Sequence, residues 1–194
     1  MAQKHADKIR CFGGKPGQEL YAAYHDEEWG VHVYDDKVLF EMLCLEGAQA
    51  GLSWETVLKK RAGYRAAYHG FDIDKIIAMT DEALEALRYD DGIVKNRLKI
   101  YSVRKNAFIF RQIKQEFDSF SNYLWGFVEG KPILNRWEDH QQVPANTSLS
   151  DAISKDLKKR GMSFVGSTII YAYLQGVGVV NDHLTSCWCF DKDR

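Results

Sequence analysis

An apolar stripe with helical spacing constrains the fold of this chain more than any other feature of its sequence. The stripe advances in steps of three or four residues: Ile100, Val103, Ala107, Phe110, Ile113 and Phe117. Such steps place every member on one face of an α-helix. Nowhere in the sequence do several runs of alternating apolar and polar residues follow one another through hairpin turns. The sequence therefore predicts an all-α fold with a long helix over 100–117.

Capping residues predict where the other helices begin. The expected helices carry residues 38–45 behind Asp35 or Asp36, 53–64 behind Ser53, 72–79, 80–89, 120–127 behind Ser119, and 151–159 behind Ser148 or Ser150. The segment 167–174 is rich in β-branched residues, which would suit a strand. Because no partner strand is evident, we expect a helix buried on most sides. Residues 131–147 contain two prolines and are predicted to form a loop.

The length and composition of the chain fit one domain. It has 194 residues, of which 45% are hydrophobic and 27% charged, and a chain of this length buries roughly two-thirds of its unfolded surface. We expect one domain over 11–190, an N-terminal extension (1–10) and a C-terminal tail (191–194). The extension lacks the apolar core of a signal peptide, and no run of about 18 uncharged apolar residues follows. These absences predict a cytoplasmic protein with no membrane partner, and nothing requires more than a monomer.

A possible contact for nucleic acid lies in residues 87–97, although the formal net charge of −1 counts mildly against such a partner. This segment predicts a helix, a tight hairpin and a second helix. Gly92 and Ile93 would let backbone amides approach a phosphate, and Lys95 and Arg97 would add positive charge. An ordinary turn between two helices looks similar, so the motif alone leaves both interpretations open.

Glu46 is the most conspicuous charged residue, because its neighbours over 42–54 are otherwise apolar or small. A carboxylate in such a segment is not expected to face open water, and burying it unpaired costs several kcal/mol or forces its protonation. The alternative is a surface glutamate on an amphipathic helix. Gly51 and Leu52 follow shortly afterwards and mark a break between two helices.

Aromatic residues cluster on either side of Glu46 in the sequence. They are Tyr21 and Tyr24, which share one helix face, then Trp29, and Trp54 just beyond the break. Aromatic faces hold a planar base that has left its stack, and they attract a cationic base further by about 0.5–2 kcal/mol. Each ring considered alone is better explained by core packing.

Residues that bind metals occur at both ends of the chain. Cys11 and His25 come early, and His183 and Cys187 come late, one helical turn apart. Two cysteines and two histidines make a closed tetrahedral zinc site with no open position, which would be structural. Cys189 could replace Cys187, whereas Cys44 lies in an apolar run and is expected to be a core thiol.

Five strings of residues, in this order, carry a resemblance to a known family. They are 24–30 (YHDEEWG), 45–54 (LEGAQAGLSW), 57–61 (VLKKR), 157–161 with 164–166, and 180–183 (VNDH) followed by Cys187. With these strings the chain resembles, from about Cys11 to Cys189, the bacterial DNA-3-methyladenine glycosylase I family, a branch of the helix-hairpin-helix glycosylases. The resemblance implies a helix-hairpin-helix glycosylase-like bundle, with one lobe that includes the 87–97 hairpin and a second lobe formed by both chain ends.

The resemblance also implies roles for the candidate residues. Glu46 and Tyr24 would hydrogen-bond the flipped methylated adenine, Trp54 would stack on it, and Tyr21 and Trp29 would help to wall the pocket. One structural zinc ion would be held by Cys11, His25, His183 and Cys187. The DNA-anchoring hairpin would comprise Gly92, Ile93, Lys95, Asn96 and Arg97, and the part that enters the DNA stack would be Gly51 and Leu52. The partner would be double-stranded alkylated DNA of the bacterial nucleoid.

Two departures from the family pattern concern the N-terminal part of the pocket. The family typically has a tryptophan shortly after the first zinc cysteine, where this chain has Phe12 followed by two glycines. One extra residue also lies between Cys11 and Tyr21. These departures leave the aromatic wall on that side undetermined.

The expected reaction is monofunctional excision of 3-methyladenine, in which water attacks the sugar and an abasic site remains. The methylated base is already cationic, so its departure neutralises it and needs less help than ordinary glycoside cleavage. A non-catalytic DNA- or RNA-binding module that recognises a modified base is the alternative. A zinc-dependent hydrolase would require an open metal position, which two cysteines and two histidines do not leave.

Overall fold

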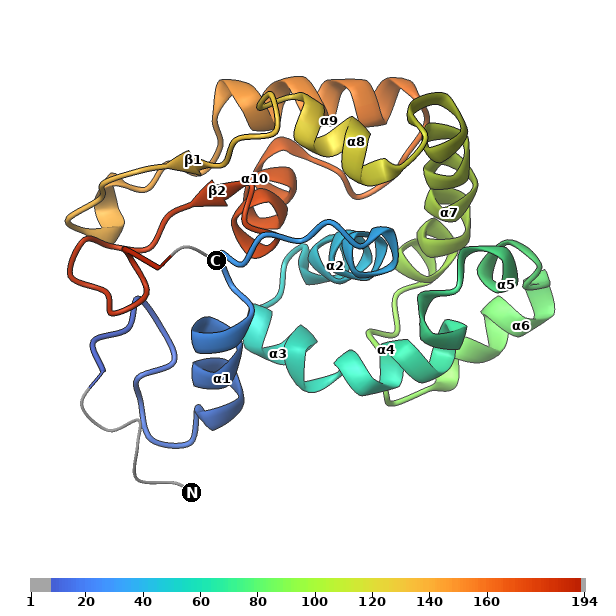
Figure 1. Ribbon diagram of the computed structural model, residues 1–194. Helices are drawn as coiled ribbons and strands as arrows, with labels where there is room; N and C mark the ends of the chain where they lie inside the picture. Colours follow the sequence, from blue (N-terminus) through green and yellow to red (C-terminus); the bar gives the residue numbers. More distant parts are fainter. Residues whose placement is uncertain (1–7, 193–194) are drawn as a thin grey trace.

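In the computed structural model, which describes residues 8–192, one buried helix lies at the centre of a helical protein (Figure 1). The helices are α1 (Glu19–Glu27), α2 (Asp36–Gln49), α3 (Trp54–Lys59), α4 (Arg61–Ala67), α5 (Ile73–Ile77), α6 (Asp81–Ala86), α7 (Arg97–Phe117), α8 (Phe120–Gly126), α9 (Ser148–Lys159) and α10 (Ser167–Gly176). Short 3₁₀ turns span His69–Phe71, Leu87–Tyr89 and His140–Gln142. Residues 1–7 of the expected extension and 193–194 of the expected tail lie outside the described residues.

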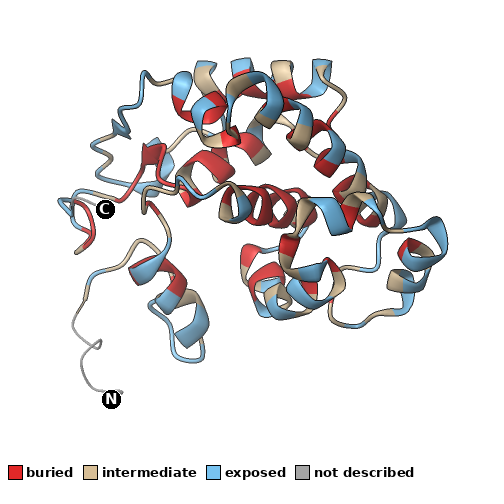
Figure 2. Cartoon of the chain, turned by 45° about the vertical axis from the view of Figure 1, so that its right-hand side comes forward, coloured by how far each residue is buried: buried red, intermediate tan, exposed pale blue. Residues whose placement is uncertain are grey.

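Helix α2 is central because it is apolar on nearly every face. The Asp35 side chain accepts a hydrogen bond from the Val38 amide and begins the helix. From Leu39 to Ala48 every residue is buried, which Figure 2 shows as an almost continuous run of red. Helices α3, α7, α8 and α10 pack around it. The position of Glu46 on this helix therefore determines that its carboxyl group lies inside the protein.

The predicted apolar stripe lies on α7, as expected. Ile100, Val103, Ala107, Phe110 and Ile113 are buried, and Phe117 is half-buried. The Phe110 ring stacks on Phe120 of α8 at 4.1 Å between centroids and contacts Phe40 of α2 at 4.9 Å. The segment 167–174 is also confirmed as a helix, because it forms α10 between α2 and α9.

The expected helix over 53–64 was wrong in one respect, because the structure divides it into α3 and α4 at Lys60. Ser53 does cap its beginning, by accepting from the Thr56 amide at 3.2 Å. The break turns α4 so that Gly63 packs directly on Gly92, where a Cβ added to Gly63 would lie 2.2 Å from the Gly92 oxygen. This close backbone contact attaches α4 to the 87–97 turn.

Two further expectations were wrong. Helix α9 is capped by Thr147 instead of Ser148 or Ser150, because Thr147 and Ser150 form a reciprocal capping box. The expected loop over 131–147 contains strand β1 (Ile133–Leu134), which pairs in parallel with β2 (Val180–Asn181), Ile133 opposite Val180. Strands of two residues are too short to show alternation, so the sequence gives no signal for them.

The first and last segments of the described chain meet beside α1, as Figure 1 shows for the blue and dark red segments. The Trp188 amide donates to the Ile9 oxygen at 3.0 Å, and the Leu184 amide donates to the Cys11 sulfur at 3.3 Å. Within residues 8–192, no helix has the length and apolar character needed to cross a membrane.

Candidate functional site

A cavity of about 360 Å³ opens between α1, the C-terminal half of α2, the beginning of α3 and α10. The five residues that the sequence predicted for a base pocket all lie on its wall: Tyr21, Tyr24, Trp29, Glu46 and Trp54. The remaining lining residues are Phe12, Gln49, His140, Val143, Ala172, Gln175 and Asp182. The fold thus brings together residues that are up to 170 positions apart, from Phe12 to Asp182.

Glu46 is buried in this wall with a relative exposure of only 3%. Burial raises the pKa of its carboxyl group to about 8, since transfer out of water disfavours the charged form. Among the described residues, two buried side-chain atoms have no hydrogen-bond partner, and they are Oε2 of Glu46 and Nε1 of Trp54. Buried polar atoms are nearly always paired, so an unpaired acceptor and an unpaired donor in one cavity point to a ligand that would pair with both.

Aromatic rings form the rest of the wall. Phe12 stacks on Tyr21 at 4.5 Å between centroids and meets Trp29 edge-on at 5.0 Å. Phe12 therefore supplies the wall on the side where the family pattern has a tryptophan. Tyr24 lies 5.3 Å from the Trp54 ring, and its pKa is raised by burial and by the neighbouring Glu46, so it remains a phenol that can donate.

Gly176 of α10 keeps the cavity open next to these polar groups. A Cβ at this position would lie 3.2 Å from the Tyr24 hydroxyl oxygen and 3.7 Å from Oε1 of Glu46. A side chain here would crowd the Tyr24 hydroxyl and the Glu46 carboxyl group.

Sequence reasoning missed Asp182, a second buried carboxyl group in the wall. Its Oδ1 accepts from the Asn135 amide at 2.7 Å and the Trp137 indole at 2.8 Å. Its Oδ2 accepts from the Gln175 amide at 2.7 Å and from the Tyr171 hydroxyl. Asp182 therefore ties the 131–147 segment to α10 around the cavity. Its place directly before His183, inside a string that carries the resemblance, was the available signal.

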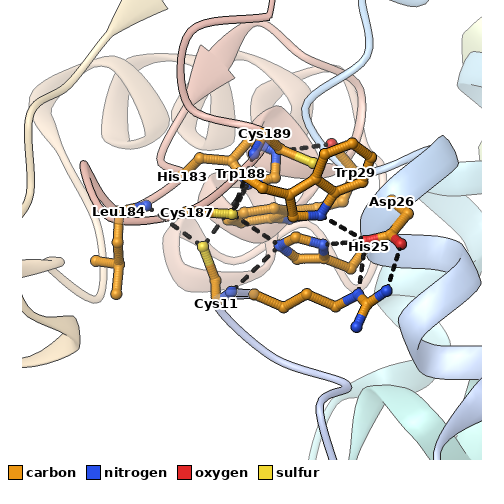
Figure 3. Close-up of polar contacts among 10 residues, drawn as sticks. Cys11, His25, Asp26, Trp29, His183, Leu184, Cys187, Trp188 and Cys189 are labelled. Carbon is orange, nitrogen blue, oxygen red and sulfur yellow. Dashed lines mark hydrogen bonds and ion pairs between the residues drawn. The ribbon is translucent and has the colours of Figure 1, made fainter. Parts of the chain in front are cut away.

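The four predicted metal-binding residues also come together, with their ligand atoms all within 4.8 Å of one another (Figure 3). The Cys187 sulfur lies 3.4 Å from Nε2 of His25 and 3.5 Å from Nδ1 of His183. The Cys11 sulfur lies 3.7 Å from the same His183 nitrogen. This set of two thiols and two imidazoles could hold a metal ion.

The outer nitrogens of the two histidines are fixed by the surrounding protein. Nδ1 of His25 donates to Asp26 at 2.9 Å, and Nε2 of His183 donates to the Trp29 oxygen at 3.2 Å. Arg10 holds the Asp26 carboxylate through two bonds of 2.8 Å. These contacts direct the lone pairs of the inner nitrogens toward the sulfur atoms, as ligand histidines require.

The cysteines differ in environment. The pKa of Cys187 is lowered by a hydrogen bond from the Cys11 thiol, while that of Cys11 is raised by its bond to Cys187 and by burial. Cys189 lies near His25 and Asp26, outside the set of four. Cys44 is a buried core thiol, as predicted, and burial raises its pKa.

The residues predicted to contact DNA lie in two exposed turns. Gly51 has a positive φ of 78°, and Leu52 is 41% exposed at the break between α2 and α3. In the 87–97 turn, Ile93 is buried, so only its backbone can reach a partner. Asn96 caps α7 by accepting from the Lys99 amide at 3.1 Å.

The two basic side chains of the 87–97 turn already have acidic neighbours. Lys95 pairs with Asp91, and Arg97 donates to Glu85 at 2.7 Å. Their positive charge is therefore partly compensated within the protein.

The family model for methyladenine glycosylase matches residues 15–190 of this chain. The chain belongs to the methyladenine glycosylase family. It is 50% identical to the DNA-3-methyladenine glycosylase 1 of Escherichia coli (strain K12) over 185 residues, which cover 95% of this chain and 98% of the relative.

Two solved structures show the same likeness. The 3-methyladenine DNA glycosylase I of Staphylococcus aureus has a TM-score of 0.91 at 34% identity, covering 95% of this chain and 98% of that one. A variant of 3-methyladenine DNA glycosylase I in complex with 3-methyladenine has a TM-score of 0.87 at 35% identity, covering 89% and 93%.

In this methyladenine glycosylase, the cavity and the metal-capable cluster share the same short strings. Tyr24 lines the cavity and precedes His25 of the cluster, and Asp182 lines the cavity and precedes His183. Trp29 connects the two, because it lines the cavity and its backbone oxygen accepts from His183 of the cluster. A displacement of a cluster histidine would therefore also displace its neighbour in the cavity wall, because the two are joined by a single peptide unit.

Proposed function

We propose that this protein is a DNA repair glycosylase that excises 3-methyladenine from alkylated DNA by hydrolysing the N-glycosidic bond. The observation that carries the proposal is the buried, unpaired Glu46 oxygen inside an aromatic cavity. The names of the relatives and the 3-methyladenine complex of a structural neighbour support the same substrate.

Glu46 would select the base by charge. In the protein alone its raised pKa keeps most of the carboxyl groups protonated at neutral pH. A base that carries a fixed positive charge, such as adenine methylated at its ring nitrogen, stabilises the carboxylate and lowers that pKa. A neutral adenine gives no such compensation. The desolvated acid thus favours the damaged base and accepts hydrogen bonds from its amino edge.

The aromatic residues would hold the plane of the base. Trp54 stacks on it, Tyr24 donates a hydrogen bond, and Tyr21 and Trp29 close the sides, with Phe12 completing the wall. Rings around a cationic base add cation–π attraction. Undamaged purines could still enter, but they would gain only the apolar part of this recognition.

The chemistry follows from the charge of the substrate. The leaving base becomes neutral as the bond to the sugar breaks, so the protein need not supply a strong acid, and water completes the reaction at the sugar. Within the described chain, the cavity lining contains no lysine that could form a Schiff base. We therefore infer a monofunctional reaction that leaves an abasic site.

The DNA contacts would come from the two exposed turns. The 87–97 turn would hold a phosphate through backbone amides, as a hairpin of the helix-hairpin-helix type does, and the Gly51–Leu52 turn would enter the stack where the base leaves. The Gly92 and Val94 amides already donate to Asp90 and Tyr64. We expect the neighbouring amides of Ile93 and Lys95 to face the phosphate. One protein monomer would act on double-stranded DNA.

The set of two cysteines and two histidines would hold one zinc ion with all four positions filled. The donor types and the fixed outer nitrogens fit zinc. When bound, the ion would supply a structural crosslink between the chain ends, without taking part in the reaction. His25 would thereby fix the neighbouring Tyr24 in the cavity wall.

The test is release of free 3-methyladenine from methylated duplex DNA, measured by chromatography. The wild-type protein is expected to release the base and leave abasic sites without strand cleavage. Glu46→Gln is the control variant, and it should lose most of this activity. Binding to methylated DNA without release of any base would overturn the glycosylase proposal and favour a non-catalytic module that recognises a modified base.

A further inference from the structure

Lys99, in the first turn of α7, reaches across to the end of α2. Its Nζ donates to the Ala48 oxygen at 2.8 Å and to the Ala50 oxygen at 2.6 Å. These carbonyl groups belong to the last turn of the helix that carries Glu46, directly before Gly51 and Leu52. The contact therefore joins α7 to the segment between the cavity and the exposed turn at 51–52.

These bonds give hydrogen-bond partners to two carbonyl groups at the end of α2. The last carbonyl groups of a helix have no partner within the helix, and a cation near them also interacts favourably with the helix dipole. The Gln49 oxygen accepts from the Leu52 amide at 2.6 Å. Lys99 takes the carbonyls on either side of it. The turn at 50–52 is thus held by two hydrogen-bond donors. One is the Leu52 amide within the turn, and the other is Lys99 of α7.

Lys99 differs from the other cations around the beginning of α7. Lys95, Arg97 and Arg104 each pair with a carboxylate, whereas Lys99 forms no ion pair among the described residues and uses only carbonyl oxygens. A cation in the first turn of a helix is disfavoured by the dipole of that helix. Burial also lowers the pKa of Lys99. The interaction with α2 is what compensates for this position.

The other side of the 51–52 turn is attached to the same region. Nζ of Lys60, at the break between α3 and α4, donates to the Asp91 oxygen at 2.5 Å. Gly63 packs on Gly92. The helix before the turn and the helices after it are therefore both fixed to residues 90–99, where Asn96 accepts from the Lys99 amide.

We propose that Lys99 is a positioning residue that couples phosphate binding at the 87–97 turn to the position of Gly51, Leu52 and Glu46. The proposal rests on the proposed function. When DNA is bound at the 87–97 turn, Leu52 is pushed against the base stack. Lys99 then holds the end of α2 in place. Gly51 has a positive φ. Without the Lys99 side chain, Gly51 is free to move, and the flipped base enters the cavity less often.

The test compares Lys99→Met with Lys114→Met on the same helix. Lys114 pairs with Asp36 at 3.0 Å, near the other end of α7, and serves as a matched loss of one lysine contact. Affinity for free 3-methyladenine is measured by tryptophan fluorescence, and duplex affinity by anisotropy. Base flipping is followed with 2-aminopurine beside the lesion, and excision is measured in single turnover.

Lys99→Met is expected to bind free base and duplex within about twofold of wild type, while flipping amplitude and single-turnover excision fall at least tenfold. Lys114→Met should match wild type in all four measurements, and Lys99→Arg should recover part of the loss. If Lys99→Met excised the base as fast as wild type, the proposal would be overturned. A loss of free-base affinity as large as the loss of excision would also overturn it, because it would indicate a general disruption of the cavity. If the wild-type protein released no free 3-methyladenine, the proposed function would be refuted. The 2-aminopurine measurement of base flipping would still test the role of Lys99.

Discussion

Replacing Glu46 with glutamine should abolish recognition of the base and change the stability of the fold in a pH-dependent way, with stabilisation only toward pH 8. The ordinary pKa of a glutamate is 4.5, and burial raises that of Glu46 to about 8. Below pH 4.5 the group is protonated in both the folded and the unfolded state and contributes no pH dependence. Between the two values the unfolded chain is ionised and the folded chain is not, so folding requires uptake of a proton.

The magnitude follows from linkage. Each pH unit between the two pKa values removes about 1.36 kcal/mol from the free energy of unfolding, so the loss from pH 4.5 to about 8 approaches about 5 kcal/mol. Glutamine does not titrate, but its buried amide group lacks a partner at a cost of about 1–3 kcal/mol. The variant should therefore be less stable than wild type near pH 4.5 and more stable by about 2–4 kcal/mol at pH 8.

The assay is urea unfolding of both proteins between pH 4.5 and 8.5, at constant metal and salt concentration. Other groups titrate alike in both proteins, so their contributions cancel in the difference between the two free energies of unfolding. A difference that stays constant across this range would refute the reasoning, because it would mean that water reaches Glu46 and that its pKa is ordinary.

Three further results are expected. In the wild type, the rate of excision at limiting protein should rise about tenfold per pH unit up to about pH 8, because the carboxylate of Glu46 pairs with the cationic base. A rate that does not change with pH would contradict this role. Cys187→Ala should lose the bound metal, as measured by elemental analysis, and should unfold at lower urea concentration; a well-folded, metal-free variant with full excision activity would show that the cluster does not support the cavity. Gly63→Ala should cost about 1–3 kcal/mol of stability and weaken duplex binding, since its Cβ would meet the backbone of Gly92 at 2.2 Å, and an unchanged urea midpoint would rule out this contact.

Much of the fold was predictable because helical periodicity is a local signal. The stripe on α7 and the caps at Asp35 and Ser53 follow from residues within a few positions of one another. The break at Lys60 and the pairing of β1 with β2 were not predictable, because each depends on a partner that is distant in the sequence. Local patterns contain no information about such partners.

The sequence by itself determined which residue types stand in the strings 24–30, 45–54 and 180–183, and hence the family and the candidate base pocket. Only the tertiary structure decided that Asp182 lines that pocket and that Lys99 holds the end of α2. The physical reason is that the protonation and the role of a buried carboxyl group depend on its hydrogen-bond partners. Within residues 8–192, Oε2 of Glu46 has no hydrogen-bond partner, whereas Asp182 has four, and the sequence does not show how many partners either carboxyl group has.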